Sequence, residues 1–196
     1  MRLCVVVGAL AGVIATFAAS AGAHFSTGVY THNGCPGNRV DPVNFVFYDN
    51  AYGGRTLNQI EYHAGWRNTS GSTQYFYSHD TCSVMDSQRA SGCGACSRYH
   101  IRLNNIHYDT DVGYTAVGDA HHEDFIWYCG HAVDSNGSNG SGFDQGRRAL
   151  RTAFSNDGHT WSSVYWGNTQ NFKQCDGDYA GSDGWVVWMH LHAYFH

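Results

Sequence analysis

The chain has 196 residues, a formal net charge of −5 and only 14% charged residues, but 13 histidines, 13 tyrosines and 24 glycines. An acidic chain without a cluster of lysine and arginine repels polyphosphates, which argues against a nucleic acid as a partner. This length is enough for one domain with its own hydrophobic core.

The first 23 residues have the composition of a secretory signal peptide. Arg2 provides a basic start, residues 4–19 are almost all apolar, and residues 21–23 (Ala-Gly-Ala) have the small side chains of a cleavage site. The apolar run is shorter than the roughly 20 residues that a membrane helix needs. We therefore expect cleavage after Ala23 and one secreted, extracellular domain over residues 24–196, with no membrane anchor.

Cleavage would leave an even number of cysteines, which predicts three disulfide bonds in an oxidising compartment. These cysteines are Cys35, Cys82, Cys93, Cys96, Cys129 and Cys175. Among the possible pairings we favour a bond between Cys129 and Cys175, and we place Cys82, Cys93 and Cys96 near one another. The CxxC spacing at 93–96 lies in a loop-like stretch, which favours structural bridging over a redox role.

The first elements of the predicted fold come from hydrophobic patterns. The β-rich run at 43–48 predicts a strand, and residues 74–77 predict another. Between them, apolar residues recur at helical spacing from 55 to 64, and Gly65 is suited to end that helix. Residues 80–97 carry three cysteines and little periodicity, so we expect an irregular segment held by disulfides.

Residues 98–104 alternate as in a half-buried strand. One face has Tyr99, Ile101 and Leu103, and the other has Arg98, His100, Arg102 and Asn104. A neutral imidazole between two guanidinium groups suits the binding of a phosphate or carboxylate. The alternative is a strand face exposed to solvent. Residues 112–117 predict a partner strand that ends at Gly118.

A dense polar string follows at Asp119-Ala120-His121-His122-Glu123-Asp124. If the string is extended, His121 and Glu123 share one face, and His122 and Asp124 share the other. Either pair could supply metal ligands, or a histidine base oriented by a carboxylate. The spacing differs from established zinc signatures such as HExxH, so we assign no metal to it.

The last third of the chain predicts a glycine-rich loop, a helix and two strands. The loop covers 135–142, and the amphipathic helix covers 143–154, with Ser141 or Asp144 as its N-cap. The late strands are expected at 161–166 and 185–194, the second carrying His190 and His192 on one face. Together these elements predict a single α+β domain with a mainly antiparallel sheet and about two helices, stapled by disulfides.

Several short strings resemble a known family. They are Asp41-Pro42-Val43-Asn44-Phe45-Val46-Phe47, Ala64-Gly65-Trp66, Arg98-Tyr99-His100-Ile101-Arg102-Leu103, Gly113-Tyr114-Thr115, His121-His122-Glu123-Asp124 and Phe143-Asp144-Gln145-Gly146-Arg147. Over residues 41–154 the chain resembles the LssY C-terminal-type domain and, more closely, small exported bacterial proteins. The cysteine-bearing segment and the tryptophan-rich C-terminal part depart from that pattern. The resemblance implies a compact α+β domain but no particular reaction.

Two functions remain open. The first is an extracellular hydrolase for a small anionic substrate, in which His122 acts as base, Asp124 orients it and Arg102 holds the anion. We assign catalysis to His100, Arg102, His122 and Asp124, and substrate contacts to Arg98, Asn104, Asp144 and Arg147. The second is a non-enzymatic module that binds cell-wall or other extracellular polysaccharide through Trp161, Trp166 and Trp185. The cofactor, if there is one, is unknown; a copper site at an N-terminal His24 is one option.

Overall fold

A computed structural model of the chain describes residues 30–49, 56–78, 81–85, 87–92, 97–104, 107–109, 113–126, 130–134, 141–168, 172–173 and 179–191. The predicted signal peptide, His24, His192 and the loop at 135–140 lie outside these residues, as do Cys93, Cys96, Cys129 and Cys175. Neither of the described helices has the length and hydropathy needed to cross a membrane.

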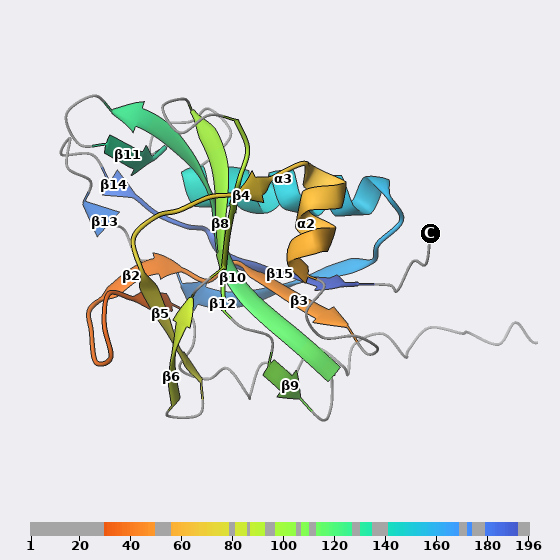
Figure 1. Cartoon of the computed structure of the whole chain (residues 1–196), viewed down its shortest axis with the longest axis horizontal. Coiled ribbons are helices and arrows are strands. Elements are labelled where there is room, and N and C mark those ends of the chain that lie inside the picture. The colour runs from red at the N-terminus through yellow and green to blue at the C-terminus, as the bar shows by residue number, and fades with distance from the viewer. Residues whose placement is uncertain are drawn as a thin grey trace, which may run out of the picture.

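The described chain contains two helices and three sheets (Figure 1). The helices are α2 (Thr56–Ala64) and α3 (Gly142–Asn156). The strands are β1 (Tyr30–His32), β2 (Arg39–Pro42), β3 (Phe45–Asp49), β4 (Arg67–Asn68), β5 (Gln74–Ser78), β6 (Thr81–Met85), β7 (Ser87–Ala90), β8 (Arg98–Leu103), β9 (His107–Asp109), β10 (Gly113–Ile126), β11 (Gly130–Val133), β12 (Trp161–Asn168), β13 (Phe172–Lys173), β14 (Tyr179–Ala180) and β15 (Gly184–His190).

The large sheet has nine strands, seven of them in the order β12-β15-β3-β10-β8-β7-β4, while β9 and β11 also pair with β10. A smaller sheet has the order β2-β1-β5-β6, and β13 pairs with β14. Among the described strands, β15 and β3 pair in parallel and every other pair is antiparallel. This arrangement confirms the predicted α+β fold with a mainly antiparallel sheet and two helices.

Both helices cover one face of the large sheet (Figure 1). The core on this face includes Phe45 and Phe47 of β3 with Leu150 and Phe154 of α3, all of them buried. Helix α3 approaches β10 so closely that a Cβ atom on Gly146 would lie 2.3 Å from the backbone nitrogen of His121. Only glycine fits at this contact, which fixes the helix against the strand.

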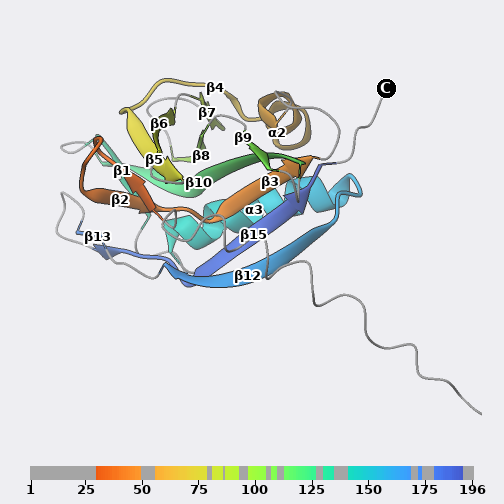
Figure 2. The same ribbon diagram turned by 90° about the horizontal axis from the view of Figure 1, so that it is seen from below.

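The smaller sheet covers part of the opposite face of the large sheet, and Figure 2 shows its strands β1, β2, β5 and β6 at the left and upper left. There Phe76 of β5 and Met85 of β6 pack against Val46 of β3 and Val117 of β10. The large sheet is therefore buried on both sides around β10, which becomes the central strand of the molecule.

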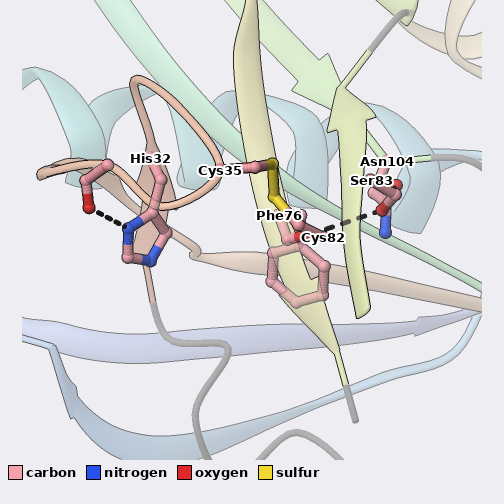
Figure 3. The surroundings of a disulfide bond; sticks show 7 residues. His32, Cys35, Phe76, Cys82, Ser83 and Asn104 are labelled. Atoms are coloured by element: carbon pink, nitrogen blue, oxygen red, sulfur yellow. Dashed lines mark hydrogen bonds between the residues drawn. A yellow bond between two sulfur atoms is a disulfide. The ribbon is translucent and has the colours of Figure 1, made fainter. Parts of the chain in front are cut away.

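A disulfide bond joins Cys35, in the turn after β1, to Cys82 of β6, with 6.0 Å between their Cα atoms (Figure 3). Beside it, the Ser83 hydroxyl donates to the side-chain oxygen of Asn104 at 2.8 Å (Figure 3). The expected proximity of Cys82 to Cys93 and Cys96 concerns two cysteines outside the described residues. Cys82 itself is bonded to Cys35, 47 residues earlier in the chain.

The expected strands and helices recur with small shifts, but two expectations were wrong. Residues 80–97 were expected to be irregular, whereas they contain β6, which pairs with β5, and β7, which pairs with β8. The strand expected to end at Gly118 continues to Ile126. Its polar continuation remains extended because β8 and β11 pair with it there and supply partners for its charged side chains.

Candidate functional site

The polar string on β10 presents alternate residues to opposite faces of the large sheet, as its extended conformation requires. His121 and Glu123 point toward the face that the smaller sheet covers, where they contact Arg98 and His100 of β8. His122 points to the helix side, where its ring lies 4.8 Å from that of Tyr99. The string therefore contributes to two separate groups of side chains.

The first group is a buried network of ion pairs. The Arg98 Nε donates to Glu123 Oε2 at 2.7 Å. Arg102 donates through one terminal nitrogen to Asp41 at 3.0 Å and to Asp119 at 3.2 Å. Each of these side chains is almost fully removed from solvent, which is tolerated only because each charge has an opposite charge in contact with it.

Two histidines complete this network with different charges. Burial alone would lower the pKa of His121, but its hydrogen bonds to Asp119 at 3.1 Å and Glu123 at 3.0 Å raise the pKa to about 9. Burial lowers the pKa of His100 to about 4, although its hydrogen bond to Glu123 acts in the opposite direction. At neutral pH the network thus holds one imidazolium and one neutral imidazole.

The buried network places two guanidinium groups and one imidazolium against three carboxyl groups. Burial and the neighbouring Asp119 raise the pKa of Asp41 above its ordinary value, while Arg102 acts in the opposite direction. Ligand atoms of His100, His121 and Glu123 lie within 4.8 Å of one another, as a metal site requires. However, both ring nitrogens of His121 already donate to carboxylates, and two arginines supply the positive charge that an ion would bring. We therefore interpret this group as structural.

This geometry alters the role expected for the polar face of residues 98–104. Arg98, His100, Arg102 and Asn104 are 1–8% exposed, so the alternative of a solvent-exposed face was wrong. A substrate on the helix side of the sheet has no access to the guanidinium of Arg102. The expected partnership between Arg102 and His122 is therefore not formed, because neighbouring elements cover the two faces separately.

The second group lies on the helix side. The hydroxyl of Ser97 lies 2.8 Å from Nε2 of His122, and Oδ2 of Asp134 lies 3.5 Å from Nδ1 of the same ring. Nδ1 is buried and has no hydrogen-bond partner among the described residues. Gln145 of α3 donates to Asp134 Oδ2 at 2.9 Å and so helps to position that carboxylate. The order serine, histidine, aspartate is that of a nucleophile, its base and an orienting acid.

Three neighbouring segments bring this group together. Ser97 directly precedes β8, and Tyr99, two residues later, is paired with His122 across the sheet. Asp134 follows β11, which forms a hairpin with β10, and its backbone nitrogen donates to the carbonyl of His122 at 2.9 Å. Asp124 is also close, because ligand atoms of His122, Asp124 and Asp134 lie within 4.8 Å of one another.

A groove of about 690 Å³ lies between the two helices and β8. Its lining residues are His63, Ala64, Trp66, Ser91, Tyr99, Ala149, Thr152, Ala153, Asn156 and Asp157. The ring of Tyr99 stacks on Trp66, with centroids 5.7 Å apart, and also touches His122. One side chain therefore joins the wall of the groove to the proposed base.

The other two residues expected to contact substrate are engaged within the protein. Arg147 of α3 makes a two-pronged ion pair with Asp183, at 2.5 and 2.6 Å, and Asp144 accepts from the backbone nitrogen of Asp183 at 3.2 Å. Burial alone would raise the pKa of Asp183, but its bonds from Arg147 hold the pKa below the ordinary value. This ion pair fixes the start of α3 to the strand that follows Asp183.

Sequence reasoning selected His122 and Asp124 but missed Ser97 and Asp134. Neither residue lies in a recognisable motif, and serine nucleophiles with a histidine base are identified by geometry and not by spacing. Comparison with known proteins finds no match to a protein-family model, to a curated protein or to a solved structure. The resemblance to the LssY C-terminal-type domain stays a prediction of the sequence.

Proposed function

We propose that this protein is a secreted serine hydrolase that cleaves esters, with Ser97 as nucleophile, His122 as base and Asp134 as the residue that orients the base. The observation that carries the proposal is the 2.8 Å contact between the Ser97 hydroxyl and Nε2 of His122, with a carboxylate on the other side of the ring. The exposure of Ser97 supports this role, because a nucleophile must reach its substrate.

The chemistry follows from these positions. The oxygen of Ser97 attacks the ester carbonyl carbon while His122 Nε2 takes the hydroxyl proton, and the alcohol then leaves with that proton. Water then attacks the resulting acyl-serine and gives a proton to His122. The carboxylic acid leaves as His122 returns this proton to the Ser97 oxygen, which regenerates the serine. The carboxylate of Asp134 stabilises the imidazolium, and its 3.5 Å separation is the loose geometry common before substrate binds.

The groove supports an ester with an apolar or aromatic portion as substrate. Trp66 and Tyr99 form one wall, while Ala149 and Ala153 of α3 form another. Such walls gain free energy by covering apolar surface, at about 25 cal/mol per Å². In this proposal the apolar part of the substrate lies against Tyr99 and its ester group reaches His122.

Export is part of the proposal. The apolar segment before residue 24 and the Cys35–Cys82 bond support it, since such bonds persist in oxidising compartments. Expression with the complete N-terminus in an exporting host should yield a secreted protein that begins at His24, as measured by intact mass. Recovery of a reduced chain that retains Met1 in the cytosol would contradict this part of the proposal.

A fluorophosphonate probe tests the nucleophile without knowledge of the natural ester. Its phosphorus forms a bond to an activated serine oxygen and fluoride leaves, so intact mass and peptide mapping identify the labelled residue. We expect labelling at Ser97 that is lost in Ser97→Ala and His122→Ala. Labelling at another serine, or none in a folded wild-type protein, would reject the proposed mechanism.

Two matched variants decide which carboxylate orients the base. Asp134→Asn should slow probe labelling and ester hydrolysis by at least about 100-fold, because its amide no longer favours the reactive tautomer. Asp124→Asn, two positions from His122 on the same strand, should change the rate by less than about 3-fold. A larger loss of rate in Asp124→Asn than in Asp134→Asn would show that Asp124 orients the base.

A specific observation also supports polysaccharide binding as a second candidate function. Trp161 and Tyr165 on the edge strand β12, with Trp185 on β15, are exposed by 43–56%, and the rings of Tyr165 and Trp185 are in contact at 5.4 Å. An exposed aromatic row of this kind is common at binding surfaces. Trp166, also expected there, is half-buried and packs on Trp188.

Pull-down on insoluble polysaccharides tests this candidate. The double substitution Trp161→Ala and Trp185→Ala should reduce retention at least about 10-fold if the row binds glycan. Tyr62→Ala on α2 is the matched control, because Tyr62 is 73% exposed but lies outside the row. Equal retention of all variants and wild type would exclude the row as the binding surface.

A further inference from the structure

Two histidines far apart in the sequence meet beside the groove, away from the proposed serine site. His63 lies at the end of α2 and His159 follows α3, and their Nε2 atoms are 2.9 Å apart. The amide oxygen of Gln59, one helical turn before His63, lies 2.6 Å from the same Nε2 atom of His63. Both rings pack on Phe154, with centroids 4.8 and 5.4 Å from it, so the buried core fixes their positions.

The outer nitrogens of the two rings determine where their protons lie. Nδ1 of His63 is 2.5 Å from a carboxylate oxygen of Asp157, and Nδ1 of His159 is 3.2 Å from the backbone carbonyl oxygen of His190. Both of these partners only accept hydrogen bonds, so both Nδ1 atoms carry the proton. In the neutral rings the two Nε2 atoms therefore present lone pairs.

When both rings are neutral, the lone pair of His63 Nε2 therefore lies close to that of His159 Nε2 and to the amide oxygen of Gln59, and such acceptors repel one another unless a proton or a metal cation lies between them. Histidines that bind metal usually donate their other N–H group to a carboxylate or a backbone carbonyl. His63 and His159 each have one of these two partners. The side chains of His63 and Asp157 also line the groove, which provides a path for an ion from solvent.

We propose that His63 and His159, with the amide oxygen of Gln59, bind a zinc ion through their Nε2 atoms at the groove. Two nitrogen ligands and an oxygen suit this borderline divalent cation, and a water molecule from the groove can complete a tetrahedral set. Zn–N bonds of about 2.0–2.1 Å place two ring nitrogens about 3.3 Å apart in that geometry. The observed separation of 2.9 Å is about 0.4 Å shorter than this distance, so zinc binding requires the two rings to move slightly apart. The proposal is independent of the hydrolase mechanism.

Zinc titration of the full, oxidised protein with remaining thiols blocked tests the proposal, with competition from a chromophoric chelator as the readout. His63→Gln and His159→Gln should each bind one equivalent less zinc than the wild type. Asp157→Asn should still bind this equivalent of zinc, but with an affinity about 10–100-fold lower, because the substitution removes the carboxylate that orients His63. His32→Gln is the control, since His32 lies on β1 and contacts Gly37.

A second measurement keeps the test decisive if a histidine variant fails to fold. Long-range ¹⁵N–¹H spectra of wild-type imidazoles, recorded with and without zinc, should show Nε2 of His63 and His159 changing on zinc addition while both Nδ1 atoms stay protonated. Equal zinc stoichiometry and affinity in folded wild-type and His159→Gln protein, or no change at these two rings on zinc addition, would overturn the site.

Discussion

The two faces of β10 give neighbouring residues opposite properties. His121 lies between two carboxylates, 1% exposed, with a pKa raised to about 9. The next residue, His122, contacts an exposed serine hydroxyl on one side, and its other ring nitrogen is buried with no hydrogen-bond partner in the described part of the chain. Both side chains are imidazoles in one extended strand, so the difference arises from what covers each face.

The dense polar string of β10 therefore divides between a stabilising network on one face and the proposed chemistry on the other. On the side of the smaller sheet, each charged side chain contacts an opposite charge, as expected of a network that holds two sheets together. On the helix side, a groove lies beside Tyr99, whose ring contacts that of His122. The predictions below test this division, from the largest expected effect on stability to the smallest.

Glu123→Ala should lower the free energy of unfolding by about 3–5 kcal/mol, because it leaves Arg98 and His121 buried without their shared carboxylate. Asp124 is the next residue and points to the opposite face of β10, so Asp124→Ala should lower the free energy of unfolding by less than about 1 kcal/mol. Urea denaturation monitored by tryptophan fluorescence provides both values. Similar losses in the two variants would show that the faces do not divide as proposed.

Replacement of both Cys35 and Cys82 by serine should lower the free energy of unfolding by about 2–4 kcal/mol, since the bond closes a long loop in the unfolded chain. The bond holds the smaller sheet, so the loss should leave the helix side intact. Denaturant titration measures the loss, and fluorophosphonate labelling of Ser97 should proceed at the wild-type rate. A parallel loss of labelling would indicate that the two faces are coupled.

The stability of the wild type should fall by up to about 3 kcal/mol as pH rises from about 6.5 to about 9. The sign follows from His121, whose folded pKa is raised: its contribution is complete below the unfolded pKa near 6.5 and is lost as pH rises through about 9. His121→Asn should remove this part of the pH dependence. The difference between wild type and variant in urea denaturation isolates it, and equal slopes would exclude His121 as the cause.

His100 should produce the opposite effect at acidic pH, of similar size or smaller. Its folded pKa is lowered to about 4, so its contribution is complete above about 6.5 and is lost as pH falls toward 4. His100→Gln should reduce the loss of stability between pH 6.5 and 4, again measured by urea denaturation. A variant that loses stability over this range as steeply as the wild type would contradict the buried, neutral state of this ring.

Ser97→Ala should change the free energy of unfolding by less than about 0.5 kcal/mol, because Ser97 is exposed, yet it should abolish probe labelling. Thermal unfolding and labelling of the same preparation measure the two effects. This combination separates a catalytic residue from a structural one most directly. A large loss of stability in Ser97→Ala would show that Ser97 has a structural role.

Local patterns determined much of the fold. The helical spacing before Gly65, the cap at Ser141 and the alternation from Arg98 to Asn104 each predicted an element that the structure contains. These signals depend on residues within a few positions of one another, which is the range over which helix and strand geometry acts. The division of His121 and His122 between opposite faces follows from the same rule.

Tertiary structure decided which groups meet. The sequence contains no signal that joins Ser97 to His122, or His63 to His159 across 96 residues. It also could not reveal that the polar face of β8 is buried, because that depends on where the smaller sheet packs. Side-chain contacts between distant segments depend on the packing of whole elements, and burial then determines whether a histidine is charged, neutral or free to accept a proton.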